Sequence, residues 1–147
     1  MLRKFLNTLM ILCFLSSVAI GQDAQVKSDE PRLNTASITV YGLAPVAVYE
    51  RILPFGDNFG AIASAGLFFY GSDTYGYSLG ATFYVGTDKH KGELGAVYLN
   101  EVLPIAYGSY RYTNASGLFA KGGLGYTFMD DGEEGGVVPI LAIGYAF

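Results

Sequence analysis

Residues Pro139–Phe147 read PILAIGYAF and alternate between large and small side chains. The large ones are Leu141, Ile143, Tyr145 and Phe147, and the small ones between them are Ala142, Gly144 and Ala146. Because successive side chains of a β-strand point to opposite faces of a sheet, this alternation predicts a strand with two different faces. One face is suited to lipid and the other to a crowded interior.

The other end of the chain, residues 1–21, has the pattern of a secretory signal peptide. Arg3 and Lys4 form a positively charged start, Leu9–Leu15 forms a short apolar run, and Ala19–Gly21 supplies small residues before a cleavage site. We therefore predict export and cleavage before Gln22. A membrane anchor is the alternative, but it would need about 20 consecutive apolar residues. This run is shorter and is followed by two serines.

Composition narrows the class of the exported chain. Removing residues 1–21 from the 147-residue chain leaves 126 residues, enough for one domain, and takes the net charge from −4 to −6 because Arg3 and Lys4 are lost. Hydrophobic residues make up 51% of the chain and charged residues 15%, against about 25% charged in soluble domains. Since no apolar run is long enough for a transmembrane helix, the chain is either a soluble β fold or a membrane β-barrel.

Several functions are disfavoured by missing residue types. The only cysteine, Cys13, lies in the predicted signal peptide, so we expect no disulfide and no thiolate metal site. The exported part has no basic stripe, which argues against a nucleic-acid partner. His90 is the only histidine and sits between two lysines in a predicted turn with no serine beside it, which disfavours a Ser-His-acid hydrolase and a histidine metal site. We therefore expect no enzymatic activity, no metal and no cofactor.

The exported chain divides into a polar start and a region of short alternating segments. Residues 22–34 are polar and aperiodic, and we predict a flexible periplasmic leader there, followed by a β domain over residues 35–147. Eight strands are predicted, at about Ala36–Leu43, Pro45–Leu53, Phe59–Gly71, Tyr77–Thr87, Glu93–Glu101, Pro104–Thr113, Gly117–Met129 and Val137–Phe147. The connection at Gly42–Pro45 is either a loop or a bend in one long strand, which would leave seven strands. Bacterial single-chain barrels have even strand numbers, which favours eight.

Strand length separates the soluble and membrane alternatives. Most of the predicted strands have about 9–11 residues, as tilted transmembrane strands require, whereas soluble strands have about 5–6. We predict an all-β fold, an eight-stranded antiparallel up-and-down transmembrane β-barrel. An even strand number places both ends of the barrel domain on the periplasmic side. The turns at residues 54–58, 88–92 and 114–116 would then be periplasmic, and those at residues 72–76 and 130–136 would face outward.

Charged residues within the strands predict what fills the lumen. Lipid disfavours Lys121 by about 2–4 kcal/mol at the bilayer midplane, so Lys121 is expected to point inward. The same reasoning turns Arg111 inward and the tyrosines on either side of it outward. With Glu50 and Glu93 also inward, we predict a lumenal ion-pair cluster near the periplasmic end, made of Glu50, Glu93, Arg111 and Lys121.

The predicted cluster has two possible roles. An eight-stranded barrel has an interior just wide enough for side chains to fill, and buried charges need partners, so we expect the cluster to plug the lumen. A proton or ion path is the alternative. Glycines recur in mid-strand, and we predict that they relieve crowding on the inner face. They are Gly66, Gly80, Gly95, Gly108, Gly123, Gly125 and Gly144.

The densest charge feature is the acidic run of Asp130, Asp131, Glu133 and Glu134. Its carboxylates could hold Ca²⁺ or bridge through divalent cations to lipopolysaccharide. The run lacks the ligand spacing of a calcium-binding loop. We therefore predict a solvated loop.

Taken together, the chain resembles the small outer-membrane β-barrel proteins of the OmpA/OmpX-like class in Gram-negative bacteria. The resemblance covers Thr35–Phe147 and is carried by YERIL (Tyr49–Leu53), GSYRY (Gly108–Tyr112), GLFAKGGLG (Gly117–Gly125) and the terminal PILAIGYAF. One departure is the absence of Trp, so that Tyr and Phe would supply the interfacial aromatic residues.

The resemblance implies an outer-membrane location and a structural or interaction role in the cell envelope. Outer-membrane lipids are the implied partners, together with the assembly machinery that reads a C-terminal barrel strand, here the strand with Tyr145 and Phe147. A narrow pore is the first alternative and a lipid-modifying enzyme the second. A soluble ligand-binding barrel is the rival at the level of the fold. The oligomeric state stays open.

Overall fold

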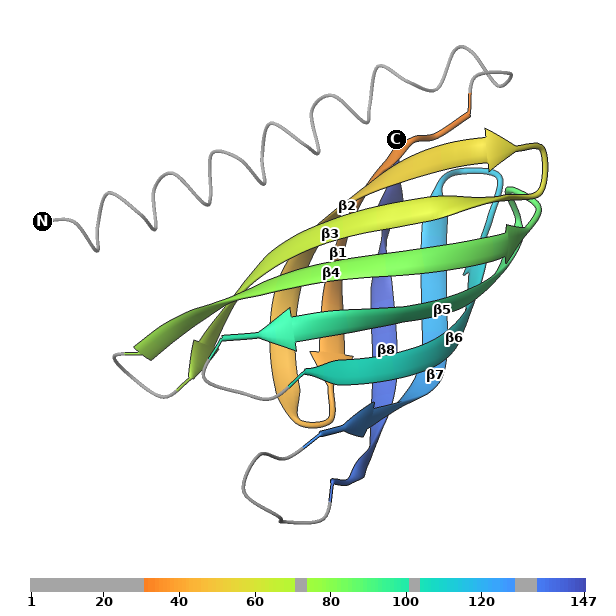
Figure 1. Ribbon diagram of the computed structural model, residues 1–147. Coiled ribbons are helices and arrows are strands. Elements are labelled where there is room, and N and C mark those ends of the chain that lie inside the picture. The colour runs from red at the N-terminus through yellow and green to blue at the C-terminus, as the bar shows by residue number, and fades with distance from the viewer. Residues whose placement is uncertain (1–30, 71–73, 101–103, 129–134) are drawn as a thin grey trace, which may run out of the picture.

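The computed structural model describes residues 31–70, 74–100, 104–128 and 135–147, and there the chain forms a closed β-barrel (Figure 1). Eight antiparallel strands follow one another around the barrel in chain order, and the last pairs with the first. They are β1 (Asn34–Tyr41), β2 (Ala44–Gly56), β3 (Phe59–Tyr70), β4 (Thr74–Gly86), β5 (His90–Leu99), β6 (Ile105–Thr113), β7 (Leu118–Thr127) and β8 (Val137–Ala146). The predicted all-β, eight-stranded, up-and-down antiparallel barrel is confirmed.

The connection after β1 is a hairpin loop and not a bend. Tyr41 pairs with Ala44, so Gly42 and Leu43 form a two-residue turn. Gly42 has a φ of 65°, and glycine at the first central position is the pattern of a type II′ hairpin turn. Its N–H donates to the carbonyl of Pro139 on β8 over 2.9 Å, which ties the turn to the neighbouring strand.

Several predicted strand limits were wrong by a few residues. Strand β1 begins at Asn34, so the last residue of the predicted leader already belongs to the sheet. Strand β2 continues beyond Leu53 to Gly56 through an irregular pairing with β3. Strands β4 and β5 begin earlier than predicted, at Thr74 and His90, inside segments assigned to turns. In each case pairing with a neighbouring strand extends the strand into residues whose composition alone is typical of turns. The predicted signal peptide, residues 1–21, lies outside the described residues.

The two ends of the barrel have different connections. At one end, here called the terminal end, lie the start of β1, the end of β8 and the connections β2–β3, β4–β5 and β6–β7. Asn34 and Phe147 meet there, each donating its backbone N–H to the carbonyl of the other, over 3.0 and 2.8 Å. The connections β1–β2, β3–β4, β5–β6 and β7–β8 lie at the opposite end. The predicted sharing of one side by both barrel termini is confirmed.

The outer surface of the described strands is apolar. Strands β6, β7 and β8 alternate as predicted: Tyr110, Leu124 and Leu141 are exposed, whereas Arg111 and Lys121 are buried. The charged residues of the eight strands are Glu50, Arg51, Lys91, Glu93, Arg111 and Lys121, and only Arg51 among them is exposed. This polarity is the reverse of a soluble barrel in water, where charged side chains lie outside. No helix among the described residues is long and apolar enough to cross a membrane, a finding that does not bear on crossing by strands.

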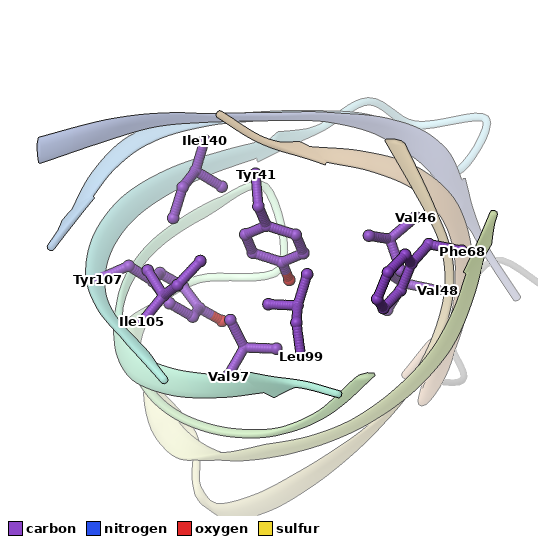
Figure 2. Close-up of a cluster of buried hydrophobic side chains, with 9 residues drawn as sticks. All are labelled: Tyr41, Val46, Val48, Phe68, Val97, Leu99, Ile105, Tyr107 and Ile140. Atoms are coloured by element: carbon purple, nitrogen blue, oxygen red, sulfur yellow. The ribbon is translucent and has the colours of Figure 1, made fainter. Parts of the chain in front are cut away.

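The lumen contains two kinds of layer. Towards the opposite end, large apolar side chains meet in the centre of the barrel (Figure 2): Tyr41, Val46, Val48, Phe68, Val97, Leu99, Ile105, Tyr107 and Ile140. We call this group the apolar layer. The charged side chains lie nearer the terminal end. The apolar layer was not predicted, because inward-facing side chains were predicted only from charged residues and from small ones.

Small residues make room for both layers. Six of the seven predicted glycines lie on the inner face, where a Cβ atom would come within 3.0 Å of another strand's atoms. Gly123, for example, would press on the carbonyl oxygen of Gly108 and on Ser109. Gly108 itself is the exception, since it alternates with the inward-facing Tyr107 and Arg111 and is exposed. Its assignment to the inner face was wrong.

Candidate functional site

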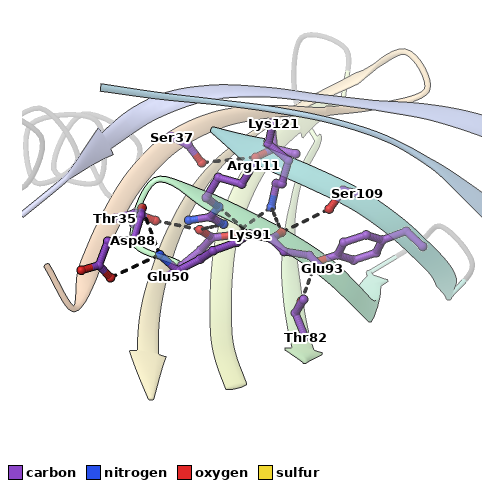
Figure 3. A network of polar contacts seen from close by, with 12 residues as sticks. Thr35, Ser37, Glu50, Thr82, Asp88, Lys91, Glu93, Ser109, Arg111 and Lys121 are labelled. Carbon is purple, nitrogen blue, oxygen red and sulfur yellow. Dashed lines mark hydrogen bonds and ion pairs between the residues drawn. The ribbon is translucent and has the colours of Figure 1, made fainter. Parts of the chain in front are cut away.

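Four charged side chains meet in the lumen on the terminal-end side of the apolar layer (Figure 3). They are Glu50 on β2, Glu93 on β5, Arg111 on β6 and Lys121 on β7. All four side chains are buried, with exposed fractions that range from 0% for Glu93 to 4% for Glu50. These are the four residues that the sequence placed in a lumenal cluster, and the structure brings all of them together.

The four groups form a ring of alternating charge. Arg111 contacts Glu50 through Nη2 and Glu93 through Nε, with N···O distances of 2.5 Å in both pairs. The Nζ of Lys121 lies 3.1 Å from Oε1 of Glu50 and 3.3 Å from Oε2 of Glu93. Each carboxylate therefore contacts both cations, and the ring is neutral as a whole. Neutrality matters because an unpaired buried charge is strongly destabilising.

Neutral side chains complete the contacts of the ring. The hydroxyl of Thr35 donates to Glu50 over 2.7 Å, and the hydroxyl of Ser109 donates to Glu93 over 3.2 Å. The guanidinium of Arg111 lies over the phenyl group of Phe119, with Cζ 4.5 Å from the phenyl centroid, which is a cation–π contact. Charge-assisted hydrogen bonds of this kind are stronger than neutral ones and fix the side-chain positions.

The ring crosses the lumen. Strand β2 has β1 and β3 as its neighbours, yet Glu50 contacts side chains from β6 and β7. These contacts join facing walls of the barrel rather than adjacent strands. The apolar layer does the same, since the Tyr41 ring on β1 meets the Tyr107 ring on β6 edge-on at 6.5 Å. Two successive layers of side chains thus span the interior.

A fifth buried charge, Lys91, was not predicted at the site. The sequence reading assigned it to a turn, but it lies on β5 and points inward with 6% exposure. The alternation that places Glu93 inside also places Lys91 inside, two residues earlier, and this signal could have identified it. In the strand register, Lys91 on β5 lies opposite Arg111 on β6, and Arg111 lies opposite Lys121 on β7. The three cations therefore form one row across these strands.

Lys91 has weaker partners than the cations of the ring. Its Nζ lies 3.8 Å from a carboxylate oxygen of Asp88 and donates to the backbone carbonyl of the same residue over 3.3 Å. The Asp88 side chain is 92% exposed. Water therefore competes for that carboxylate, and the pair is typical of surface ion pairs, which contribute little to stability.

A cavity lies between the ring and the terminal end of the barrel. We call it the vestibule; its volume is about 280 Å³, and Arg32, Thr35, Lys89, Lys91, Arg111 and Thr113 are among its lining residues. Arg32, in the segment before β1, donates to the carbonyls of Ala115 over 2.7 Å and Asn114 over 3.4 Å. These hydrogen bonds hold the residues just before β1 against the β6–β7 turn. The end of the predicted flexible leader is held at this point.

One donor group of Arg111 is left over from the ring. Its Nε and Nη2 face the two carboxylates, but its Nη1, although buried, has no hydrogen-bond partner among the described residues. Arginine has five N–H donors, two of them on this nitrogen. Buried polar groups in native proteins are almost always hydrogen bonded, to protein, to water or to an ion.

The other candidate residues do not join this site. His90 lies on the outer surface, hydrogen bonded through Nδ1 to the Tyr110 hydroxyl and packed against Tyr112. Its ring partner is a phenol and not the serine of a hydrolase. The acidic run at residues 130–134 lies outside the described residues. Within the part of the chain that is described, no group of three or more potential metal ligands is found.

The C-terminal strand closes the barrel. Tyr145 is paired with Ala36 on β1 and with Leu118 on β7, and Phe147 follows β8 with its backbone bonded to Asn34. Both side chains are half-buried. Comparisons with known proteins identify no relative: no family model, no curated protein and no solved structure matches the chain.

Proposed function

We propose that the chain is an integral outer-membrane β-barrel with a structural or interaction role in the cell envelope, its lumen closed by its own side chains. One observation carries the proposal: five of the six charged residues in the strands point into the lumen, while large apolar side chains cover the outside. Glu50, Glu93, Lys91, Arg111 and Lys121 are the five.

An apolar exterior is favourable in lipid and unfavourable in water. Monomeric soluble proteins rarely expose apolar patches larger than a few hundred Å², because such surfaces associate. Here exposed apolar side chains occur on every strand of the barrel. A closed barrel also satisfies all backbone hydrogen bonds between strands, which a bilayer requires of anything that crosses it.

Aromatic residues mark both edges of the apolar exterior. Tyr110 and Tyr112 are exposed near the terminal end, and Tyr75, Tyr77 and Tyr126 near the opposite end. Interfacial tyrosines of this kind form the girdles of transmembrane barrels. Their placement supports a bilayer that covers the strands between them.

Arg51, the one outward-facing charged residue of the strands, is also compatible with a bilayer around the barrel. Arg51 lies level with Asn34 at the terminal end and donates to its side-chain oxygen over 2.8 Å. The Tyr49 hydroxyl donates to the same oxygen over 2.7 Å. A long cationic side chain near a membrane surface can place its charged group in the interfacial region. Arg51 is therefore compatible with a position at the periplasmic interface.

A closed lumen supports a structural or interaction role over a pore. The charge ring and the apolar layer both join facing walls of the barrel. Since the interior of an eight-stranded barrel has room for little more than side chains, two such layers leave no continuous water path of the width that a porin has. The predicted signal peptide and the C-terminal strand further support an outer-membrane location and recognition by the assembly machinery.

Cell fractionation and gel migration test the location. Expressed with its signal peptide in a Gram-negative host, the protein is expected in the outer-membrane fraction. It should migrate on a denaturing gel at two positions, before and after boiling, because a closed barrel in detergent unfolds only on heating. Recovery from the soluble periplasm would instead indicate a soluble ligand-binding barrel and overturn the proposal.

Planar-bilayer recording tests the closed lumen. We expect no steady unitary currents from the purified protein, and steady currents would replace the closed barrel by a narrow pore. An assay of phospholipid and lipid A turnover tests the enzymatic alternative. Turnover that disappears in His90→Ala would establish an enzyme and contradict the proposed role.

A further inference from the structure

We propose that the vestibule is a binding site for a small oxyanion, of phosphate or carboxylate chemistry, held by Arg111 Nη1 and Lys91. The inference does not depend on the membrane location, because it rests on the donors, charge and size of one cavity. Arg111 is 1% exposed, lines the vestibule, and has two N–H groups on Nη1 without a partner among the described residues.

The guanidinium is oriented for such a ligand by its other contacts. Its Nε and Nη2 lie against Glu93 and Glu50, which fixes the plane of the group, whereas Nη1 contacts neither carboxylate. A guanidinium held in one plane presents its donors in a fixed geometry that suits the oxygens of phosphate or carboxylate. The side chain is thus positioned in advance of binding.

The charge around the cavity favours an anion. The ring of Glu50, Glu93, Arg111 and Lys121 is neutral, so the net charge of the vestibule is set by its other lining residues. These include the cations Arg32, Lys89 and Lys91 and a single acid, Asp88. Asp88 is almost fully exposed, and water screens it more than it screens the buried Lys91.

The volume of the cavity limits the ligand to a small one. Cavities that hold drug-sized molecules have volumes of about 300–1,000 Å³, and the vestibule, at about 280 Å³, lies below that range. A single phosphate or carboxylate group with a few waters fits this space. A hydroxyl donor is available from Thr113, which also lines the cavity.

Isothermal titration calorimetry with inorganic phosphate tests the site. The purified protein is held in maltoside micelles, which contain no phosphate, at a fixed sodium chloride concentration near 0.15 M. We expect one saturable site. Lys91→Gln should weaken binding by about tenfold or more, since it removes a buried charge-assisted donor. Lys89→Gln, at an exposed turn position where the fold is not affected, should weaken it to a smaller degree.

Arg51→Gln is the matched control, because it removes the same charge from the same end of the barrel but from the outer surface. The phosphate affinity of this variant should stay within about twofold of that of the unchanged protein, since the Arg51 charge lies on the outer surface, where salt screens it. Absence of saturable binding, or equal weakening by Arg51→Gln and Lys91→Gln, would overturn the proposal.

A second titration separates two sources of the same chemistry. Phosphatidylglycerol is added to the micelles before inorganic phosphate. If the phosphate signal disappears, the natural ligand is a lipid headgroup. If the signal persists, the ligand is a free anion. Both outcomes support an oxyanion site and assign its source.

Discussion

Arg111 and Lys121 are directly paired across β6 and β7, and both side chains are buried in the lumen. Like charges on opposed residues destabilise a sheet. Here Glu50 and Glu93 each contact both cations, so every ion pair in the ring joins opposite charges. The β6–β7 pairing therefore depends on acids supplied by β2 and β5, and several experiments follow from this dependence and from the inverted polarity of the barrel.

Glu50→Gln should destabilise the barrel by about 3–5 kcal/mol, the range observed when one partner of a buried ion pair is removed. The variant leaves Arg111 and Lys121 with Glu93 as their only carboxylate in the ring. The free energy of unfolding, measured by urea titration in lipid vesicles, gives the value. The double variant Glu50→Gln/Lys121→Met restores one acid and one base and should be more stable than Glu50→Gln alone. A double variant that is less stable would contradict the charge ring.

Leu141→Arg tests whether the outer face meets lipid. Leu141 is exposed in the middle of β8. An arginine there should cost about 2–4 kcal/mol of folding free energy in a bilayer. On a water-exposed surface the same change would be within about 0.5 kcal/mol. Val137→Arg, at the end of the same strand, serves as the control and should cost about 0–1 kcal/mol. Equal, negligible effects would argue for a soluble barrel.

Ile140→Ala tests the apolar layer. Ile140 is fully buried among the side chains of this layer, so its truncation should cost about 2–5 kcal/mol through lost contacts and a cavity. Ile143→Ala on the outer face of the same strand removes the same atoms without opening a cavity and should cost less. Unfolding of both variants in the same vesicles provides the comparison. Equal losses would indicate that the lumen is not packed at Ile140.

Two adjacent glycines of β7 should respond differently to the same substitution. A Cβ atom on Gly123 would press on the backbone oxygen of Gly108, whereas one on Gly122 would meet only Leu141, at 3.9 Å. We expect Gly123→Ala to cost about 1–3 kcal/mol, as overpacking does in other cores. Gly122→Ala should be close to neutral. The two midpoints of thermal unfolding in detergent check this, and equal midpoints would remove the case for a crowded inner face.

Phe147→Ala tests the role of the C-terminal strand. The backbone bonds between Phe147 and Asn34 do not need the phenyl ring, so folding of the purified variant into vesicles should be nearly unchanged. In cells, the yield of protein inserted in the outer membrane should fall several-fold if the assembly machinery reads this residue. Normal insertion in cells would argue against recognition through Phe147.

Alternation along single strands explains why much of the architecture could be predicted. Arg111 lies between Tyr110 and Tyr112, and Lys121 lies in a segment whose other face carries apolar residues or glycine, among them Leu118 and Leu124. In such segments a period of two assigns each side chain to a face without knowledge of its neighbours. The strand number followed from the spacing of these segments, and only the Gly42–Pro45 connection needed the structure to show a hairpin.

Prediction was less successful where pairing with another strand overrides local composition. Lys91 and His90 look like turn residues beside Asp88 and Lys89, but pairing of His90 with Tyr112 extends β5 through them. Glycine-rich and polar composition weakens the local signal for a strand, while hydrogen bonds to a neighbour stabilise it regardless. As a result, the third cation of the inner row was missed.

The amino-acid sequence by itself predicted a barrel of eight strands, and which face of β6 and β7 carries charge, because side-chain direction in a strand is a local property. Only the tertiary structure decided how the four residues of the predicted cluster pair with one another, that an apolar layer fills the other half of the lumen, and that Lys91 and Arg111 share a vestibule. These contacts join strands that are not neighbours. They depend on how the closed sheet is staggered around its axis, and no local period in the sequence specifies that stagger.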